Sequence, residues 1–183
     1  IVHADPSAEL PLAACVLDAT LVLRDATGET QMPAREFILA PMVTGIAPEQ
    51  CLAAIRFRLK EGLLWANGNP LTADDSVYSY EVAEALFPAA LPVLIQRTKT
   101  YQLKDNLTVE WRGVPGYLDG DIGGKFFSPL PRLAWGMLEP EELATAEISA
   151  RMPLGWGAYQ IVEWVGGDHL TLQKDPNYFR SAE

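Results

Sequence analysis

The sequence has few of the residues that carry covalent, redox or metal chemistry. Its 183 residues include two cysteines and two histidines. Cys15 and Cys51 are too far apart for a CxxC redox pair or a zinc-ligand cluster, so we expect free thiols, with a disulfide as the alternative. His3 and His169 have no Glu or His at metal-ligand spacing around them. The sequence therefore predicts no metal site.

Basic residues are scarce compared with acidic ones. Asp and Glu number 24 against 14 Lys and Arg, which gives a formal charge of −10. A chain with this charge repels the phosphate backbone of a nucleic acid and an anionic membrane surface. Pro and Gly interrupt the uncharged stretches before they reach the ~20 apolar residues that a membrane span needs. We therefore predict no nucleic-acid partner and no membrane span in this chain.

Catalytic signatures are missing as well. None of the serines lies in a Gly-x-Ser-x-Gly nucleophile motif. The segment 120–126 lacks the spacing of a phosphate-binding loop, and no Ser or Thr follows Lys125. Asp74 and Asp75 are consecutive, and consecutive helical residues diverge by about 100°, so they cannot act as an acid and base pair on one substrate. We expect no enzyme activity, no catalytic residue and no cofactor.

The composition is that of a folded protein. Hydrophobic residues make up 49% of the chain and charged residues 21%. The length corresponds to about one domain and a remainder. Glycine and proline, 14 of each, divide the chain into short segments, which indicates a mixed α and β fold. The chain begins at Ile1 without a signal-peptide pattern, so we expect a processed protein or a segment of a longer one.

Hydrophobic periodicity predicts the order of the elements. A helix running into a strand is expected over 9–23, with a turn at 25–28. Apolar and basic side chains alternate from 53 to 60, which predicts a half-buried strand with a basic outer face. The remaining expectations are a strand over 107–112, an ordered loop over 113–131, a short helix over 140–150, and a hairpin of strands 158–165 and 169–173.

The clearest helix is expected directly after a turn. Gly68 and Pro70 turn the chain. Thr72 is then a good N-cap, and Asp75 stands at the capping-box position three residues later. One apolar stripe follows at helical spacing, formed by Val77, Tyr80, Ala83 and Phe87.

The stretch from Phe57 to Tyr80 resembles the signature of the family 5 extracellular solute-binding proteins. These are the peptide-, dipeptide-, nickel- and oligosaccharide-binding receptors of ABC importers. The family pattern is approximately F-x-L-R-x-G-x-x-W-x-D-G-x-P-x-T-A-x-D-V-x-x-S. This chain keeps nearly all of it, with Asn67 in place of the usual Asp and Ser76 where Val is commoner.

Further stretches resemble the same family in the same order. Residues 153–179 are similar to a P-x-G-x-G-P-Y block that ends in L-x-x-N-P-x-Y-F, with Ala158 and Asp175 in place of the common Pro and Asn. Residues 127–132 are similar to a P-L-P-x-H segment, without its His. Near the start, Asp5-Pro6 is similar to the family's L-D-P.

This resemblance implies a fold and a domain organisation. Members of the family are considerably longer than this chain and fold as two lobes that close on a ligand. The implied fold is the type II periplasmic-binding-protein architecture, mixed α and β, present here as a partial first lobe with its inserted subdomain. Residues 1–20 and 149–183 would belong to the ligand-facing first lobe. Residues 21–148 would form the inserted, supporting subdomain.

The same resemblance implies a function. The chain is expected to be the extracytoplasmic substrate-binding component of an ABC importer, in the periplasm or as a cell-surface lipoprotein. It would deliver peptides or a similar small solute to the permease subunits, with no catalysis and no cofactor. The alternative is a ligand-sensing module of a regulatory or signalling protein with the same fold. Ligand contacts are expected from Ser7, Ala8, Glu9, Leu10, Trp156 and Tyr159.

Overall fold

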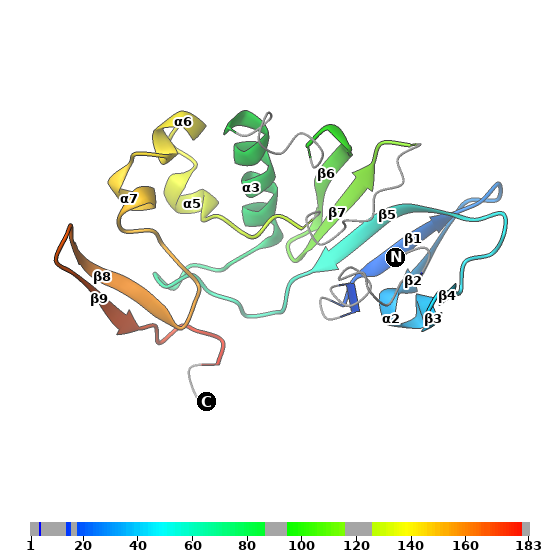
Figure 1. The fold of residues 1–183 in the computed structure, drawn as a ribbon, viewed down its shortest axis with the longest axis horizontal. Coiled ribbons are helices and arrows are strands. Elements are labelled where there is room, and N and C mark those ends of the chain that lie inside the picture. The colour runs from blue at the N-terminus through cyan, green and yellow to red at the C-terminus, as the bar shows by residue number, and fades with distance from the viewer. Residues whose placement is uncertain (1–3, 5–13, 16–17, 87–94, 116–125, 181–183) are drawn as a thin grey trace.

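The computed structural model describes residues 4, 14–15, 18–86, 95–115 and 126–180. Its main element is a five-stranded antiparallel sheet of order β2-β1-β5-β7-β6, which occupies the right half of Figure 1. The strands are β1 (Thr20–Arg24), β2 (Glu29–Pro33), β5 (Cys51–Arg58), β6 (Thr98–Asp105) and β7 (Thr108–Gly113). After β2 come helix α2 (Ala34–Phe37) and the paired short strands β3 (Ile38–Ala40) and β4 (Val43–Thr44). The mixed α and β class predicted from the sequence is confirmed.

The turn between β1 and β2 is closed by one aspartate. Asp25 Oδ1 accepts hydrogen bonds from the Thr27 backbone N–H at 2.7 Å and from the Thr27 hydroxyl at 2.6 Å. This confirms the turn predicted at 25–28. Of the helix predicted before it, Ala14 and Cys15 are helical, while 9–13 and 16–17 lie outside the described residues.

The alternation predicted for β5 is present, but a bulge shifts its first residues. Val22 pairs with Ala54 and Leu23 with Leu52, so Ala53 has no partner on β1. Leu52 therefore joins the core side of the strand, where Ala53 was expected. The strand ends at 58, two residues earlier than predicted.

The core lies between the sheet and helix α3 (Ala73–Leu86). Strands β1, β5 and β7 contribute fully buried Leu21, Ile55 and Val109. Phe127, from the segment before the small helices, packs edge-to-face on Tyr101 with ring centroids 5.0 Å apart. Both cysteines are free, as the sequence predicted.

Helix α3 buries two faces, although the sequence predicted one. Val77, Tyr80 and Ala83 of the expected stripe pack against the sheet core, and Phe87 lies outside the described residues. Tyr78 and Val82 form a second apolar cluster on another face of the helix, with partners on the small helices that follow. The helix is thus sandwiched between the sheet and these helices, as Figure 1 shows.

The small helices are α5 (Arg132–Trp135), α6 (Pro140–Leu143) and α7 (Glu147–Ala150). Pro140 stands in the first turn of α6 as expected, but the single helix predicted over 140–150 is wrong. The Ser149 hydroxyl lies within hydrogen-bond distance of the Leu143 and Ala146 carbonyls, and such side-chain bonds compete with a continuous helical ladder. Among the helices that the structure describes, none has the length and apolarity of a membrane span.

The outer face of the sheet, opposite α3, carries a network of charged side chains. Glu110 of β7 is fully buried and accepts hydrogen bonds from Arg56 Nε at 2.7 Å and Arg112 Nε at 2.9 Å. The other nitrogens of Arg112 contact both carboxylate oxygens of Glu29 at 3.1 and 3.3 Å, and Arg24 pairs with the same carboxylate. The basic outer face predicted for β5 is therefore confirmed, with its charge partly neutralised from neighbouring strands.

These contacts predict acid sensitivity. Hydrogen bonds from Arg112 and Arg24 lower the pKa of Glu29 from 4.5 to about 2. A carboxyl whose pKa is lower in the folded state stabilises the fold above its unfolded pKa, and this stability is lost as the pH falls through the folded pKa. We expect the urea midpoint to fall between about pH 4.5 and pH 2, and to fall less in Glu29→Gln than in the parent. Glu61→Gln, which removes a carboxylate from the separate Arg58 pair, is the charge-matched control. Equal acid sensitivity of Glu29→Gln and the parent would contradict this assignment.

Candidate ligand-binding site

Three segments that are distant in the sequence meet at the first turn of α3. The Asp75 carboxylate accepts hydrogen bonds from the Thr72 backbone N–H at 2.8 Å, the Trp65 indole N–H at 3.2 Å and the Arg132 backbone N–H at 2.9 Å. Asp75 is 4% exposed. The Asp75 half of the predicted capping box is confirmed, whereas the Asp75 backbone N–H bonds to the Thr72 carbonyl. The same carboxylate also connects the turn before the helix to the segment 127–132.

Two buried serines add further links between α3 and this segment. Ser79 Oγ lies 2.7 Å from the Ser128 carbonyl oxygen and accepts the Leu130 backbone N–H at 2.9 Å. Ser76 donates to the Phe127 carbonyl and lies 2.7 Å from the Tyr101 hydroxyl. The signature residues Asp75 and Ser79 of α3, together with Ser76, therefore act as structural supports.

Trp65 forms a small apolar cluster that reaches the predicted ligand residue Trp156. Leu63, Trp65 and Leu71 are buried, and Leu154 and Trp156 pack against them. The Ala66 backbone N–H donates to the Gly155 carbonyl at 2.9 Å. Trp156 is thus half-buried and held against the turn that precedes α3.

The chain after the terminal hairpin returns to the same turn. The Asn177 side-chain amide donates to the Ala66 carbonyl at 3.0 Å, and its backbone N–H donates to Asp175 Oδ1 at 2.8 Å. Asp175 is fully buried and donates its backbone N–H to the Ala158 carbonyl at 2.9 Å. Its Oδ2 has no hydrogen-bond partner among the described residues. These bonds fix the base of the hairpin to the body of the molecule.

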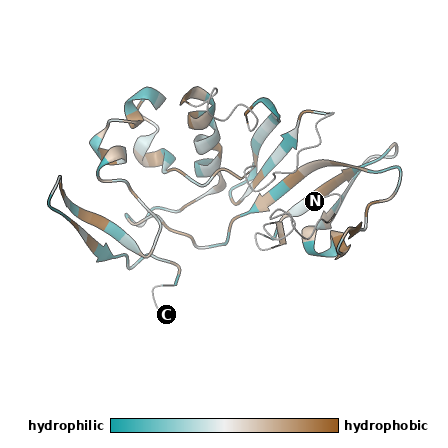
Figure 2. Cartoon of the chain, in the orientation of Figure 1, coloured by the Kyte–Doolittle hydropathy of each residue, from teal (hydrophilic) through white to brown (hydrophobic). Residues whose placement is uncertain are grey.

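The hairpin itself, β8 (Tyr159–Val165) and β9 (His169–Lys174), confirms the prediction and is amphipathic. Cross-strand pairing places Ile161 opposite Leu172 and Trp164 opposite Leu170 on one face, with Tyr159 in the same row. Tyr159 is 62% exposed and Leu172 52%. Figure 2 shows apolar segments along this hairpin, which projects from the body of the molecule. The face is apolar and open to solvent.

The structure describes two of the six predicted ligand residues, Trp156 and Tyr159. Ser7, Ala8, Glu9 and Leu10 lie outside the described residues. Trp156 and Tyr159 both stand at the base of the hairpin, but Trp156 packs in the Trp65 cluster whereas Tyr159 heads the exposed apolar face. Sequence reasoning did not identify the apolar face, although the alternation of Leu170 and Leu172 with polar residues indicates it.

Gly155 and Gly157, on either side of Trp156, have room for a side chain. A Cβ on Gly155 would lie 3.9 Å from the Gly157 nitrogen, which is ordinary contact, and one on Gly157 would meet nothing within 4 Å. Backbone does approach Gly155, whose carbonyl accepts the Ala66 N–H, but the space beside the two glycines would admit a side chain. The part of the chain that the structure describes holds no group of three or more His, Cys, Asp or Glu side chains suited to a metal ion.

Comparison with known proteins gives two family matches. The profile of the bacterial extracellular solute-binding proteins, family 5 Middle, matches residues 53–183. The profile of the FAD binding domain in molybdopterin dehydrogenase matches residues 1–57, less than a third of the chain. The second match ends inside β5, and β1 and β2 belong to the same sheet as β5.

Individual relatives agree with the first match. The oligopeptide-binding protein AppA of Bacillus subtilis is 27% identical over 131 residues, which are 67% of this chain and 23% of AppA. The structure of AppA with a nonapeptide has a TM-score of 0.61 at 24% identity and covers 70% of this chain and 26% of that one. NikZ from Campylobacter jejuni with Ni(L-His) has a TM-score of 0.57 at 20% identity and covers 98% of this chain and 34% of NikZ.

A third relative carries a different ligand. The periplasmic oligopeptide-binding protein of Thermotoga maritima with bound mannohexaose has a TM-score of 0.57 at 23% identity, over 88% of this chain and 28% of that one. The chain spans about a quarter to a third of the length of these relatives. They show that its fold is that of the type II periplasmic-binding proteins. Since the family 5 profile matches well over half of the sequence, the chain belongs to the bacterial extracellular solute-binding proteins, family 5.

Proposed function

We propose that this chain is part of the extracytoplasmic substrate-binding component of an ABC importer. In this role it captures a peptide or a similar small solute outside the cytoplasmic membrane, in the periplasm or at the cell surface, for delivery to permease subunits. The family match over residues 53–183 carries this proposal. Peptides are the first ligand class to consider because AppA is named an oligopeptide-binding protein and was solved with a nonapeptide.

The ligand-facing part is proposed at the two ends of the chain. Residues 149–183 hold the hairpin with its open apolar face, whereas 21–148 hold the sheet and α3 and support it. The limits expected at 20 and 148 fall inside β1 and α7. We therefore propose limits at the outer ends of these two elements, before Thr20 and after Ala150. Residues 1–19 then join the ligand-facing lobe.

We propose no catalysis and no flavin for this chain. The alignment with NikZ covers 98% of the chain at 20% identity, and this supports a single fold that includes residues 1–57. The sensing module considered from the sequence gains no support from AppA or the Thermotoga maritima relative, which are both named oligopeptide-binding proteins.

The solute carried by the intact protein tests this function. The protein is purified under native conditions, denatured, and the released small molecules are identified by mass spectrometry. We expect peptides, or another small solute, at about one molecule per protein. A protein that releases only flavin, or that turns over a substrate, would contradict the proposal.

Tyr159 offers a test of the proposed ligand-facing surface. Its side chain is 62% exposed, so Tyr159→Ala should leave the unfolding midpoint unchanged. We expect the intact protein with this change to bind its peptide about tenfold more weakly, which corresponds to ~1.4 kcal/mol. Leu133→Ala removes an apolar side chain that is 78% exposed on α5 and is the matched control. Parental affinity in Tyr159→Ala, measured by calorimetry, would remove Tyr159 from the site.

A further inference from the structure

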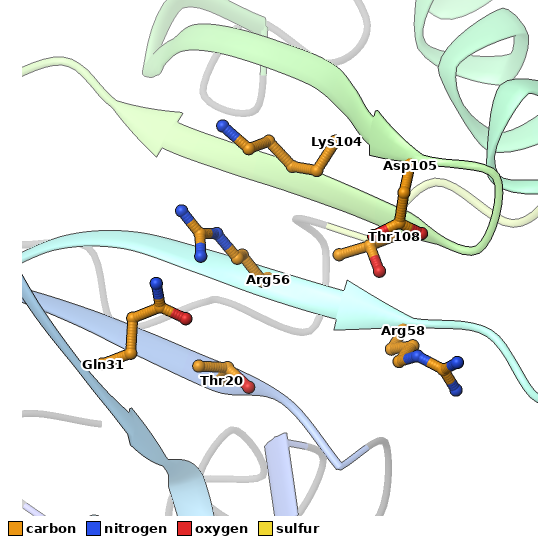
Figure 3. A pocket seen from close by; sticks show the side chains of 7 residues that line it. All are labelled: Thr20, Gln31, Arg56, Arg58, Lys104, Asp105 and Thr108. Atoms are coloured by element: carbon orange, nitrogen blue, oxygen red, sulfur yellow. The ribbon is translucent and has the colours of Figure 1, made fainter.

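We propose that the outer face of the sheet holds a binding site for an oxyanion, meaning the phosphate or carboxylate group of a small molecule. The site is a depression of about 280 Å³ on the face opposite α3 (Figure 3). Side chains from β1, β2, β5, β6 and β7 line it, among them Thr20, Gln31, Arg56, Lys104 and Thr108. None of these residues belongs to the hairpin or to the Trp65 cluster, so the site is separate from the proposed solute-binding surface.

Arg56 is the fixed cation of this site. It stands directly opposite Thr20 on β1 and Glu110 on β7 in the sheet register. Its Nε donates to the fully buried Glu110 carboxylate at 2.7 Å, and this bond leaves its two terminal amino groups for other acceptors. Arg56 is therefore held in one position before any ligand binds, so ordering the side chain costs little at binding.

Lys104 brings a second cation to the same side of the depression. The pairing register between β6 and β7 shifts at Lys104, which lies between the paired residues Leu103 and Asp105. Its Nζ is 3.8 Å from Glu110 Oε1, which is longer than a hydrogen bond. In Figure 3 the ends of Lys104, Arg56 and Gln31 lie on one side, whereas Arg58 points away from them.

The charges favour an anion at this side. Glu110 is one carboxylate facing three cations, Arg56, Arg112 and Lys104, and it is already saturated by their contacts. Glu29 pairs with Arg112 and Arg24. In a chain of net charge −10, this part of the outer face therefore holds four cations and two carboxylates, namely Arg24, Arg56, Lys104, Arg112, Glu29 and Glu110. At the opposite end Arg58 pairs with Glu61 at 2.8 Å and Asp105 lines the wall, so the positive excess is confined to the half with Arg56 and Lys104.

The lining side chains and the volume of the depression favour a small anionic ligand. The terminal amino groups of Arg56 have no acceptor among the described residues, and together with a nearby ammonium group they match the oxygens of a carboxylate or phosphate. Gln31 and Thr20 also line the depression, so its wall includes neutral amide and hydroxyl donors. A depression of about 280 Å³ is at the small end for ligand pockets, so it fits a small anionic group better than an extended chain.

Calorimetry with two probes tests the site. The intact protein is titrated at low ionic strength with inorganic phosphate and, separately, with citrate. We expect saturable binding of at least one probe, weakened about tenfold by Lys104→Gln. Lys99→Gln is the control, because it removes the same charge from an exposed position of β6 that does not line the depression. Both variants are expected to keep the parental unfolding midpoint.

Two results would overturn the proposal. The first is the absence of saturable binding of either probe up to about 10 mM. The second is an equal loss in Lys99→Gln and Lys104→Gln, because a general attraction of anions to positive charge would then explain the binding. Peptide affinity is measured on the same samples, and we expect it to be unchanged in Lys104→Gln. The failure of the oxyanion site therefore remains distinguishable from a failure of solute binding.

Discussion

Asp75→Ala is expected to destabilise the protein by about 3 kcal/mol or more. The carboxylate of Asp75 is buried and accepts N–H donors from Thr72, Trp65 and Arg132. Its removal leaves three donors in the interior without an acceptor, and each unsatisfied buried donor costs about 1–3 kcal/mol. Partial relaxation of the chain keeps the total below the sum of the three. Urea unfolding, monitored by tryptophan fluorescence, measures the change.

Asp74 provides the matched control. It is the neighbouring carboxylate of the same helical turn, but its side chain is 50% exposed and it contacts Arg132 at 3.4 Å. Exposed ion pairs of this kind contribute less than about 1 kcal/mol. We expect Asp74→Ala to change stability by no more than that. Equal stability losses in the two variants would show that Asp75 does not join the three segments.

The sequence predicted the elements whose periodicity is local. Strand β7 and the hairpin β8–β9 follow from alternation, and the turns at 25–28 and 67–70 follow from Asp, Asn, Gly and Pro. The bulge at Ala53 was missed because Ala carries no signal for either face of a strand. The break between α6 and α7 was missed because it depends on the hydrogen bonds of one serine side chain, that of Ser149.

The second face of α3 could not be predicted from an apolar stripe. Asp75, Ser76 and Ser79 are polar residues that a helical pattern places outside, yet they are buried because the segment 127–132 supplies their partners. That segment is about 50 residues away, and periodicity within the helix contains no information about it. The resemblance to family 5 marked Asp75 and Ser79 as signature residues, and the structure gives the physical reason.

The candidate site was predictable only in part. Resemblance led to Trp156 and Tyr159, and the structure places both at the base of the hairpin. Asp175 was read only as a departure from the common Asn, because nothing in a loop pattern indicates a fully buried carboxylate with one unpartnered oxygen. The basic side chains of β5 indicated a positive outer face. The sequence did not indicate that Glu110, which holds Arg56 in place, comes from the neighbouring strand β7.

We expect the 183-residue chain to bind the physiological solute at least about 100-fold more weakly than the intact protein, a difference of ~2.7 kcal/mol. The chain spans about a quarter of AppA, and the resemblance implies a ligand enclosed between two lobes. In such a cleft, affinity comes from surface buried on both sides and from the exclusion of water. With one side alone, ligand groups stay solvated and any charged terminus loses its partner.

Titration calorimetry of the 183-residue chain and the intact protein against the same peptide pool measures how much of the solute site lies in this chain. The solute released from the native protein serves as the reference ligand in both titrations. We expect saturable binding to the intact protein and weak or undetectable binding to the 183-residue chain, with both samples folded by circular dichroism. Equal affinities would place the whole solute site within residues 1–183 and contradict the proposal that this chain supplies one side of a two-lobed cleft.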